Sequence, residues 1–222
     1  MVIPEWFVSP GTDAWWQQQQ QRGLPFIEQL ENSLCRVTFL WRDPQGTEET
    51  SAFQHVWINI TGITDHHQPA PPLSLQRVPG SDVWYWQTEL PADWRGSYCL
   101  IPDTSAESPE RLTDLSQRKD WWREKFAIAG HDPLNPLRPW QGGRGMSVSP
   151  LPMPEAPCHA DWAPLDQGHA SSLNITRLKW HRQRLNNQRP LRPSEPGPTE
   201  APARPPVLLF DAHVRAVQMP LA

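Results

Sequence analysis

A chain of 222 residues is long enough for one well-packed domain and part of a second. Its formal net charge of -4 at pH 7 gives no general attraction to nucleic acid or to an anionic membrane, so neither is expected as a partner. The N-terminus lacks the cationic start and apolar stretch of a secretory signal, and no segment is apolar enough to span a membrane. A cytoplasmic protein is therefore expected.

Tryptophan and proline are distributed unevenly. Eleven of the 13 tryptophans precede residue 141, whereas the last 76 residues contain 13 of the 27 prolines. Large aromatic side chains fill cores, and proline-rich polar segments bury little apolar surface. We therefore expect the packed domain at residues 1–145 and a proline-rich linker at residues 146–206.

The three cysteines, Cys35, Cys99 and Cys158, are odd in number and form no CxxC motif. This argues against a disulfide framework and against a thiolate metal site. Cys35 and Cys99 lie in strand-like segments, where we expect them to be small buried hydrophobic residues.

The expected elements begin with a helix over residues 13–30, with Thr12 or Asp13 as N-cap. Residues 34–41 alternate with the period of two that is typical of a half-buried strand, and Asp43-Pro-Gln-Gly46 has the chemistry of a turn. Further strands are expected over residues 53–60, 83–90 and 96–101, and a second helix over residues 109–129, with Ser108 and Pro109 at its start.

The predicted fold class is α+β and mainly β. Short strands separated by turn residues, with helices at the flanks, favour an immunoglobulin-like antiparallel sandwich with a tryptophan-rich core. In the strand over residues 53–60, one face carries Val56, Ile58 and Ile60, and the other carries His55, Trp57 and Asn59.

Four sequence motifs are distinctive: Phe39-Leu-Trp-Arg-Asp-Pro-Gln-Gly46, Thr61-Gly-Ile-Thr-Asp-His-His67, Trp94-Arg-Gly-Ser-Tyr98 and Asp132-Pro-Leu-Asn-Pro136. With these motifs the chain resembles the front half of a bacterial enterochelin (ferric-enterobactin) esterase. The resemblance implies a family that hydrolyses the ester backbone of an iron-loaded siderophore. The nucleophile of such an α/β-hydrolase is expected in a Gly-x-Ser-x-Gly elbow. No such pentapeptide occurs in the sequence, so no catalytic residue is assigned.

The end of the chain is similar to the first strand of the family's hydrolase domain. Leu208-Leu-Phe-Asp-Ala212 resembles the family's Leu-Leu-Asp-Gly type of strand, with Ala212 in place of the glycine. Residues 207–222 are therefore interpreted as an incomplete start of an α/β-hydrolase domain. The resemblance implies that the remaining part of the chain walls one side of the cleft and orients the substrate.

Arg42, Trp94 and Arg95 are candidate residues for binding the siderophore. A ferric tris-catecholate is anionic and aromatic, so guanidinium groups and flat rings are suited to bind it. The alternative for Trp94 and Arg95 is structural: they could simply begin a strand in which Tyr98 packs. Ferric iron is expected only as part of the substrate, and no cofactor is expected.

Asp65, His66 and His67 are the other candidates for substrate binding. Adjacent histidines in an extended segment point to opposite faces, so they are poorly placed to bind one metal ion, and no metal site is predicted. Two interpretations stay open: a turn capped by Asp65, or a loop that borders the substrate cleft.

Two other functions fit the sequence. A stand-alone binding module for glycans or other ligands would present Trp57 or Trp84 as an exposed flat platform. An inactive remnant of a truncated gene is the second alternative.

Overall fold

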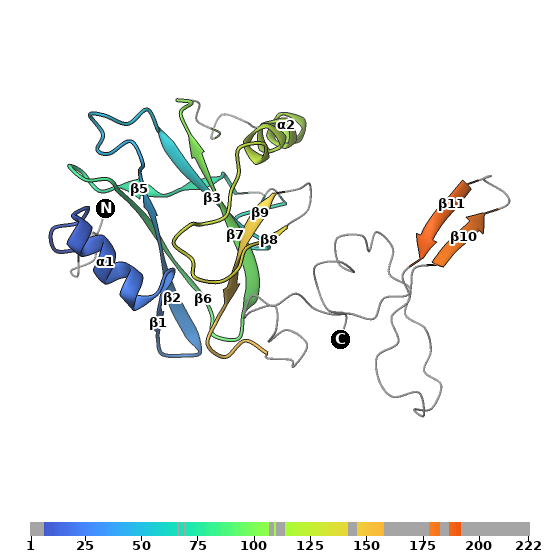
Figure 1. The fold of residues 1–222 in the computed structure, drawn as a ribbon, viewed down its shortest axis with the longest axis horizontal. Helices are drawn as coiled ribbons and strands as arrows, with labels where there is room; N and C mark the ends of the chain where they lie inside the picture. Colours follow the sequence, from blue (N-terminus) through green and yellow to red (C-terminus); the bar gives the residue numbers. More distant parts are fainter. Residues whose placement is uncertain are drawn as a thin grey trace. The chain divides into compact units, whose positions relative to one another are not determined.

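A computed structural model describes residues 7–65, 67–68, 70–106, 109, 114–141, 146–157, 178–182 and 187–191. The chain divides into two compact units, Met1–Pro157 and Cys158–Ala222, and most of the described residues belong to the first. The first unit contains both described helices and strands β1 to β9, most of which are labelled in Figure 1.

The first sheet is antiparallel, with strands in the order β1-β2-β6-β5. Its long central strands, β2 (Leu34–Arg42) and β6 (Val83–Pro91), pair along their whole length. β1 (Phe26–Gln29) and β5 (Gln76–Arg77) form the two edges. The strands predicted over residues 34–41 and 83–90 are therefore confirmed.

The second sheet has strands in the order β4-β3-β7-β9-β8. At its centre, β3 (His55–Ile60) pairs antiparallel with β7 (Arg95–Asp103). β4 (Leu73–Ser74) lies beside β3, whereas β9 (Ser147–Pro152) and the short β8 (Trp140–Gln141) extend the sheet beyond β7.

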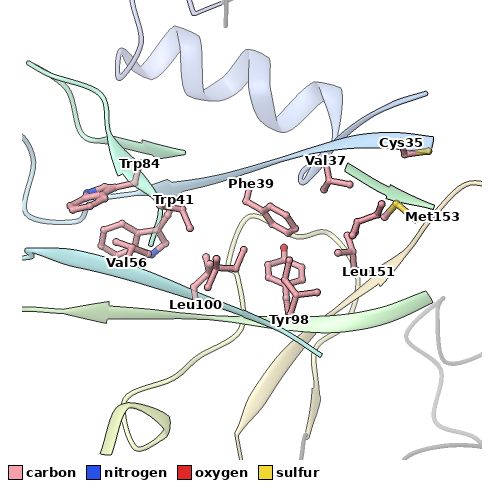
Figure 2. Packing of buried hydrophobic residues seen from close by; sticks show 14 of the residues in the cluster. Cys35, Val37, Phe39, Trp41, Val56, Trp84, Tyr98, Leu100, Leu151 and Met153 are labelled. Atoms are coloured by element: carbon pink, nitrogen blue, oxygen red, sulfur yellow. The ribbon is translucent and has the colours of Figure 1, made fainter. Parts of the chain in front are cut away.

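The two sheets pack face to face on one hydrophobic core, so the unit is a two-layer β structure (Figure 2). Alternate residues of each strand point inward, as a period of two dictates. Phe39 of the first sheet meets Tyr98 of the second edge to face, with ring centroids 4.9 Å apart. The buried members of this core are Cys35, Val37, Phe39, Trp41, Val56, Ile58, Ile60, Leu75, Trp84, Leu90, Ala92, Tyr98, Leu100, Leu151 and Met153.

Helix α1 (Asp13–Arg22) covers the outer face of the first sheet. Thr12 caps its N-terminus, and Trp15 and Trp16 are buried against Leu40 and its neighbours in the sheet. Each buried tryptophan removes about 150–250 Å² from water, which at about 25 cal/mol per Å² contributes roughly 4–6 kcal/mol as an upper estimate. Packing of this kind holds a helix whose second half is mostly glutamine.

The helix predicted over residues 13–30 is wrong in its second half. Gly23 has φ of 86°, a left-handed conformation that ends the helix, and Pro25 removes a backbone donor. Residues Phe26–Gln29 instead form β1, which pairs with β2 from Phe26 opposite Thr38 to Gln29 opposite Cys35.

Helix α2 (Leu115–Phe126) covers the outer face of the second sheet, on the opposite side of the molecule from α1 (Figure 1). The sequence placed its cap at Ser108 and Pro109, and this was wrong. Asp114 is the N-cap and accepts the backbone N–H of Ser116 at 2.9 Å, the stronger local signal for a helix start.

The prediction of a linker over residues 146–206 is wrong where the structure has strands, which are β9 near its beginning and two strands in its second half. β9 lies in that stretch, pairs with β7 and buries Leu151 in the main core. In the second unit, β10 (Leu178–Arg182) and β11 (Asn187–Leu191) form an antiparallel hairpin. The expected hydrolase start at residues 207–222 lies outside the described residues. Within the described part of the chain, no helix is long and apolar enough to cross a membrane.

Candidate functional site

Four of the predicted site residues lie at one end of the second sheet. Asp65 and His67 follow β3 in the loop that begins at Thr61, and Trp94 and Arg95 stand at the start of β7. Antiparallel pairing brings these segments together, because the backbone N–H of Thr61 donates to the carbonyl of Ser97 at 3.1 Å. His66 lies outside the described residues.

Asp65 closes the loop after β3. Its buried carboxylate accepts the backbone N–H groups of Gly62 at 2.6 Å and His67 at 3.1 Å. Thr64 adds a second closure, since its hydroxyl donates to the carbonyl of Ile58. These bonds form the capped turn that was one of the two interpretations. They also hold the exposed His67 in a defined place, which keeps the cleft interpretation open as a proposal.

Arg95 begins β7, and Trp94 directly precedes it next to the core. Trp94 is half-buried against the main core cluster, and its ring lies over Gly96 so closely that a Cβ there would be 2.4 Å from the ring. The carbonyl of Trp94 accepts the N–H of Met153 at 2.9 Å. Arg95 is partly exposed and lies opposite Pro152 of β9. Both residues therefore have the structural role of a strand start and stand at an accessible end of the sheet.

Arg42 does not join this group. It ends β2 where β6 begins, opposite Val83. The eight residue steps from Leu34 to Arg42 place it about 25 Å along the strands from the end that holds Arg95. Its guanidinium donates to Asp13 and Asp82, each at 2.8 Å, and lies 5.6 Å from the ring centroid of Trp16. Arg42 thus holds α1 to the first sheet, and one ligand subsite cannot use both arginines.

Hydrogen bonds to the two carboxylates also raise the pKa of Arg42 above its ordinary value. Its positive charge is therefore secured by Asp13 and Asp82 within the fold. A ligand would have to compete with both carboxylates for the guanidinium.

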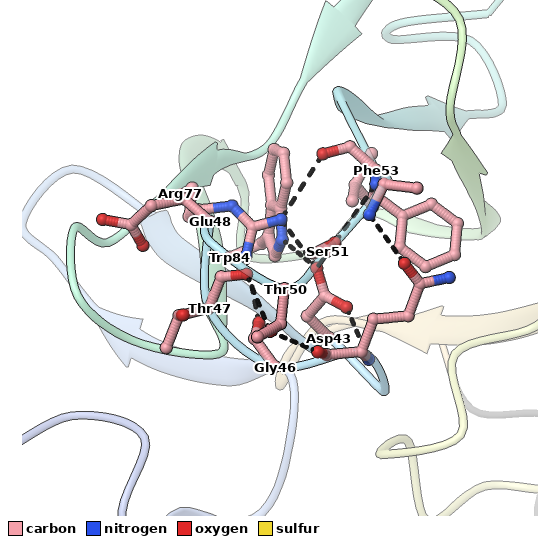
Figure 3. Close-up of polar contacts among 12 residues, drawn as sticks. Asp43, Gly46, Thr47, Glu48, Thr50, Ser51, Phe53, Arg77 and Trp84 are labelled. Carbon is pink, nitrogen blue, oxygen red and sulfur yellow. Dashed lines mark hydrogen bonds and ion pairs between the residues drawn. The ribbon is translucent and has the colours of Figure 1, made fainter.

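The Asp43-Pro-Gln-Gly46 motif is the centre of a buried polar network (Figure 3). The fully buried carboxylate of Asp43 pairs with Arg77 at 2.7 Å and accepts the hydroxyl of Ser51 at 2.6 Å and the indole N–H of Trp84 at 3.3 Å. The guanidinium of Arg77 also lies 4.4 Å from the Trp84 ring centroid. These contacts join β5, β6 and the loop between β2 and β3, so this motif is structural.

A second buried network joins the two remaining motifs. The hydroxyl of Tyr98 donates to the carboxylate of Asp132 at 2.6 Å, and the amide of Asn135 donates to the carbonyl of Pro150 at 2.9 Å. Burial raises the pKa of Asp132 above its ordinary value, although the hydrogen bond from Tyr98 opposes this rise. Asp132-Pro-Leu-Asn-Pro136 therefore fastens a long connection to β7 and β9.

A third network holds α2. Lys125 pairs with Asp103 at 2.7 Å, and both side chains are about 95% buried. The indole N–H of Trp57 donates to the same carboxylate at 3.0 Å. Burial alone would raise the pKa of Asp103, but the hydrogen bonds from Lys125 and Trp57 outweigh burial, and the pKa lies below its ordinary value.

The tryptophans expected to form a glycan platform are not exposed. Trp57 is 4% exposed beneath α2, and Trp84 is 5% exposed in the main core. The alternative of a glycan-binding module therefore loses the feature on which it depended.

The described residues show no assembled catalytic or metal-binding set. Ser147 and His131 are in contact, with Oγ and Nδ1 3.1 Å apart, but the neighbouring Asp132 directs its carboxylate to Tyr98 and to the N–H of Leu134 instead of to the histidine. Among these residues, no three His, Cys, Asp or Glu side chains are grouped so that they could hold a metal ion.

The fold and these contacts define a two-layer, tryptophan-rich β domain flanked by two helices, with its four distinctive motifs at structural turns, networks and strand starts. Residues 36–162, more than half of the chain, match the family described as enterochelin esterase, N-terminal. The chain belongs to this family.

Relatives and solved structures agree. The iron(III) enterobactin esterase of Escherichia coli O6:H1 (strain CFT073) is 42% identical over 216 residues, which are 95% of this chain and 51% of the relative. The crystal structure of ferric enterobactin esterase from Salmonella typhimurium is 40% identical with a TM-score of 0.66, over 81% of this chain and 45% of that one. The chain thus spans about half the length of the relatives it matches.

Two structures of the enterobactin esterase from Shigella flexneri were obtained with small molecules present. One, in the presence of enterobactin, is 40% identical with a TM-score of 0.64 over 83% of this chain and 45% of that one. The other, in the presence of 2,3-di-hydroxy-N-benzoyl-serine, is 41% identical with a TM-score of 0.57 over 82% of this chain and 44% of that one.

Proposed function

We propose that this chain is the substrate-orienting, N-terminal part of an esterase that opens the ester backbone of ferric enterobactin or a related catecholate siderophore. The observation that carries the proposal is the 42% identity to an iron(III) enterobactin esterase over 95% of the chain. The protein would act in the cytoplasm, where release of dihydroxybenzoyl-serine units frees the iron for reduction.

The hydrolytic step would use groups that this chain does not supply. A serine attacks a lactone carbonyl, a histidine accepts the serine proton, and backbone N–H groups stabilise the oxyanion of the tetrahedral intermediate. The acyl–serine bond forms as the lactone C–O bond breaks, and water then releases the acid. Ferric iron enters this reaction only as part of the substrate.

The contribution of this chain would be to hold the bulky substrate in one orientation. Arg95 offers a guanidinium for the anionic tris-catecholate, and Trp94 offers an aromatic face at the same strand start. The loop of Asp65, His66 and His67 lies at the same end of the sheet and would border the cleft. Arg42 is left out of this role because Asp13 and Asp82 engage it at the other end.

An immunoglobulin-like topology belongs to the same proposal. The order β1-β2-β6-β5 corresponds to strands A, B, E and D of that fold, and the order β3-β7-β9 corresponds to C, F and G. Residues 207–222 would begin the α/β-hydrolase domain, connected through the proline-rich stretch that precedes them.

Binding of ferric enterobactin to the purified chain tests the orienting role. Quenching of the 13 tryptophans should report saturable binding, and Arg95→Ala should weaken it by about tenfold, the effect of losing a charge-assisted contact worth about 1.5 kcal/mol. Arg123→Ala on the exposed face of α2 is the matched control and should leave binding unchanged. If the wild-type chain shows no saturable binding, or if both variants behave alike, the orienting role is wrong.

A second experiment tests the division of labour. The chain alone should not hydrolyse ferric enterobactin, because it lacks the nucleophile elbow. Turnover that follows the purified protein through chromatography and is abolished by a serine-directed inhibitor would contradict this expectation.

A further inference from the structure

An apolar groove lies between the segment that joins α1 to β1 and the end of β9. It has a volume of about 300 Å³ and is bounded by residues 22–27, 135–137 and 150–152. The first wall includes the start of β1, an edge strand of the first sheet, and another wall is the end of β9 in the second sheet. β8 pairs only with Ser147 and Val148, so residues 150–152 have no strand on their outer side among the described residues.

The groove offers flat apolar faces and a single charge. Four of its lining residues are prolines, Pro25, Pro136, Pro150 and Pro152, which have apolar rings and no backbone N–H. Pro136 is exposed, Pro25 and Pro152 are partly exposed, and Pro150 is buried. Among the described lining residues, Arg22 alone is charged, and its guanidinium lies 5.9 Å from the ring centroid of Phe26.

The side-chain amide of Asn135, the one amide among the described lining residues, is already used within the fold. Asn135 donates to the carbonyl of Pro150 at 2.9 Å and accepts the backbone N–H of Leu137 at 2.9 Å. A ligand would therefore bind through its apolar faces and one negative group. It would not need an extensive set of hydrogen bonds.

We propose that this groove binds a single dihydroxybenzoyl arm of the siderophore, as a product unit or as part of the intact molecule. A planar aryl ring suits the proline and Phe26 faces, and one anionic end suits Arg22. Small-molecule sites usually span about 300–1,000 Å³, so a groove at the lower limit accepts one arm and not the whole three-armed complex.

The groove lies next to the proposed orienting residues. Pro152 and Leu151 of its β9 wall pair directly with Arg95 and Gly96 of β7. An aryl subsite beside Arg95 would give a large substrate a second point of attachment, and two such points define an orientation better than one. This inference rests on the proposed function, from which the ligand class is taken.

Titration of iron-free 2,3-dihydroxybenzoyl-serine into the full 222-residue chain, followed by amide NMR, tests the groove. Signals of Gly23, Ile27 and Leu137 should shift saturably, whereas that of Arg123 should not. Leu137→Trp places an indole in the groove and should abolish the shifts at Gly23 and Ile27. If that variant does not fold, Ile27→Trp blocks the groove from the opposite wall.

Charge variants give a second readout. Arg22→Gln should weaken binding by about two- to fivefold, as expected for an exposed ionic contact, and Arg123→Gln should have no effect. Absence of saturable shifts in the wild-type chain, or unchanged binding in a folded groove-blocking variant, overturns the inference.

The same variants separate this inference from the proposed function. If ferric enterobactin binds the wild-type chain but iron-free 2,3-dihydroxybenzoyl-serine does not, the proposed aryl site in the groove is wrong. The orienting role of the chain then still stands. The Leu137→Trp variant can also be mixed with the separately expressed second half of a relative. If this variant no longer associates with that half but still binds 2,3-dihydroxybenzoyl-serine, the groove binds a polypeptide and the proposed aryl site is wrong.

Discussion

Asp43→Asn should destabilise the two-layer domain strongly. The carboxylate of Asp43 is fully buried and receives hydrogen bonds from Arg77, Ser51, Trp84 and the backbone N–H of Gln45. The amide cannot balance the positive charge of Arg77, whose side chain is only 13% exposed. Breaking one side of a buried ion pair costs about 3–5 kcal/mol. For a protein of this size that corresponds to a fall in Tm of roughly 6–20 °C.

Urea unfolding, followed by tryptophan fluorescence and near-ultraviolet circular dichroism, measures the free energy of unfolding. Asp120→Asn is the control, because Asp120 pairs with Arg123 on the surface with side chains 65% and 71% exposed. It should have no measurable effect. Adding Arg77→Met to Asp43→Asn should restore part of the loss, since the orphaned buried charge is then removed. A loss below about 1 kcal/mol for Asp43→Asn would refute the role of this network, because that is the range of an exposed pair.

Three further outcomes are expected. Gly96→Ala should lower the free energy of unfolding by about 1–3 kcal/mol, because the new Cβ would lie 2.4 Å from the Trp94 ring. In a double-mutant cycle, Trp94→Ala should remove this strain. Additive effects of the two substitutions on the free energy of unfolding would contradict the contact. Burial raises the pKa of Asp132, and the hydrogen bond from the Tyr98 hydroxyl opposes the rise. Tyr98→Phe removes a bond to the charged carboxylate, so the destabilisation it causes should decrease as the pH is lowered from about 7 and the carboxyl becomes protonated. An equal loss of unfolding free energy in urea across this pH range would contradict this. Burial raises the pKa of Cys99 to about 12, so only about one thiol in 10,000 is ionised at pH 8. Cys99 in the native protein should therefore resist alkylation until denaturant is added. Rapid labelling of native Cys99, measured by peptide mass spectrometry, would contradict its burial.

Local pattern predicted β2, β3, β6 and β7 but missed β1 and β9. In β2 the inward residues Cys35, Val37, Phe39 and Trp41 alternate with period two and are all buried in the main core. In β6 the expected inward residues Trp84 and Leu90 are buried there, and Trp86 is partly buried. β3 shows how far this goes, since Val56 faces the main core and Trp57 faces α2, the two faces expected from sequence. Both faces of β3 are covered by other parts of the fold. The alternation therefore predicted which face each side chain is on, but it did not predict whether that face is exposed to water or packed.

The candidate site was less accessible to sequence reasoning. Arg42 and Arg95 are alike as guanidinium groups near tryptophans, and only strand register places them at opposite ends of the domain. The polar motifs presented the same difficulty: Asp43 looks like a turn residue, yet its partner Arg77 is 34 positions away and comes from another strand. The groove could not be predicted from local sequence patterns, because its prolines come from three separate segments.

Composition and periodicity alone determined that this chain builds a tryptophan-rich antiparallel β domain with buried cysteines at Cys35 and Cys99. These features depend on the side chains of neighbouring residues and on the apolar area they must bury, which are local properties. Tertiary structure decided which charges are neutralised inside the fold, where the first helix gives way to β1, and which segments form the groove. These depend on partners distant in sequence, because a hydrogen bond or ion pair is made only when both strands are in register.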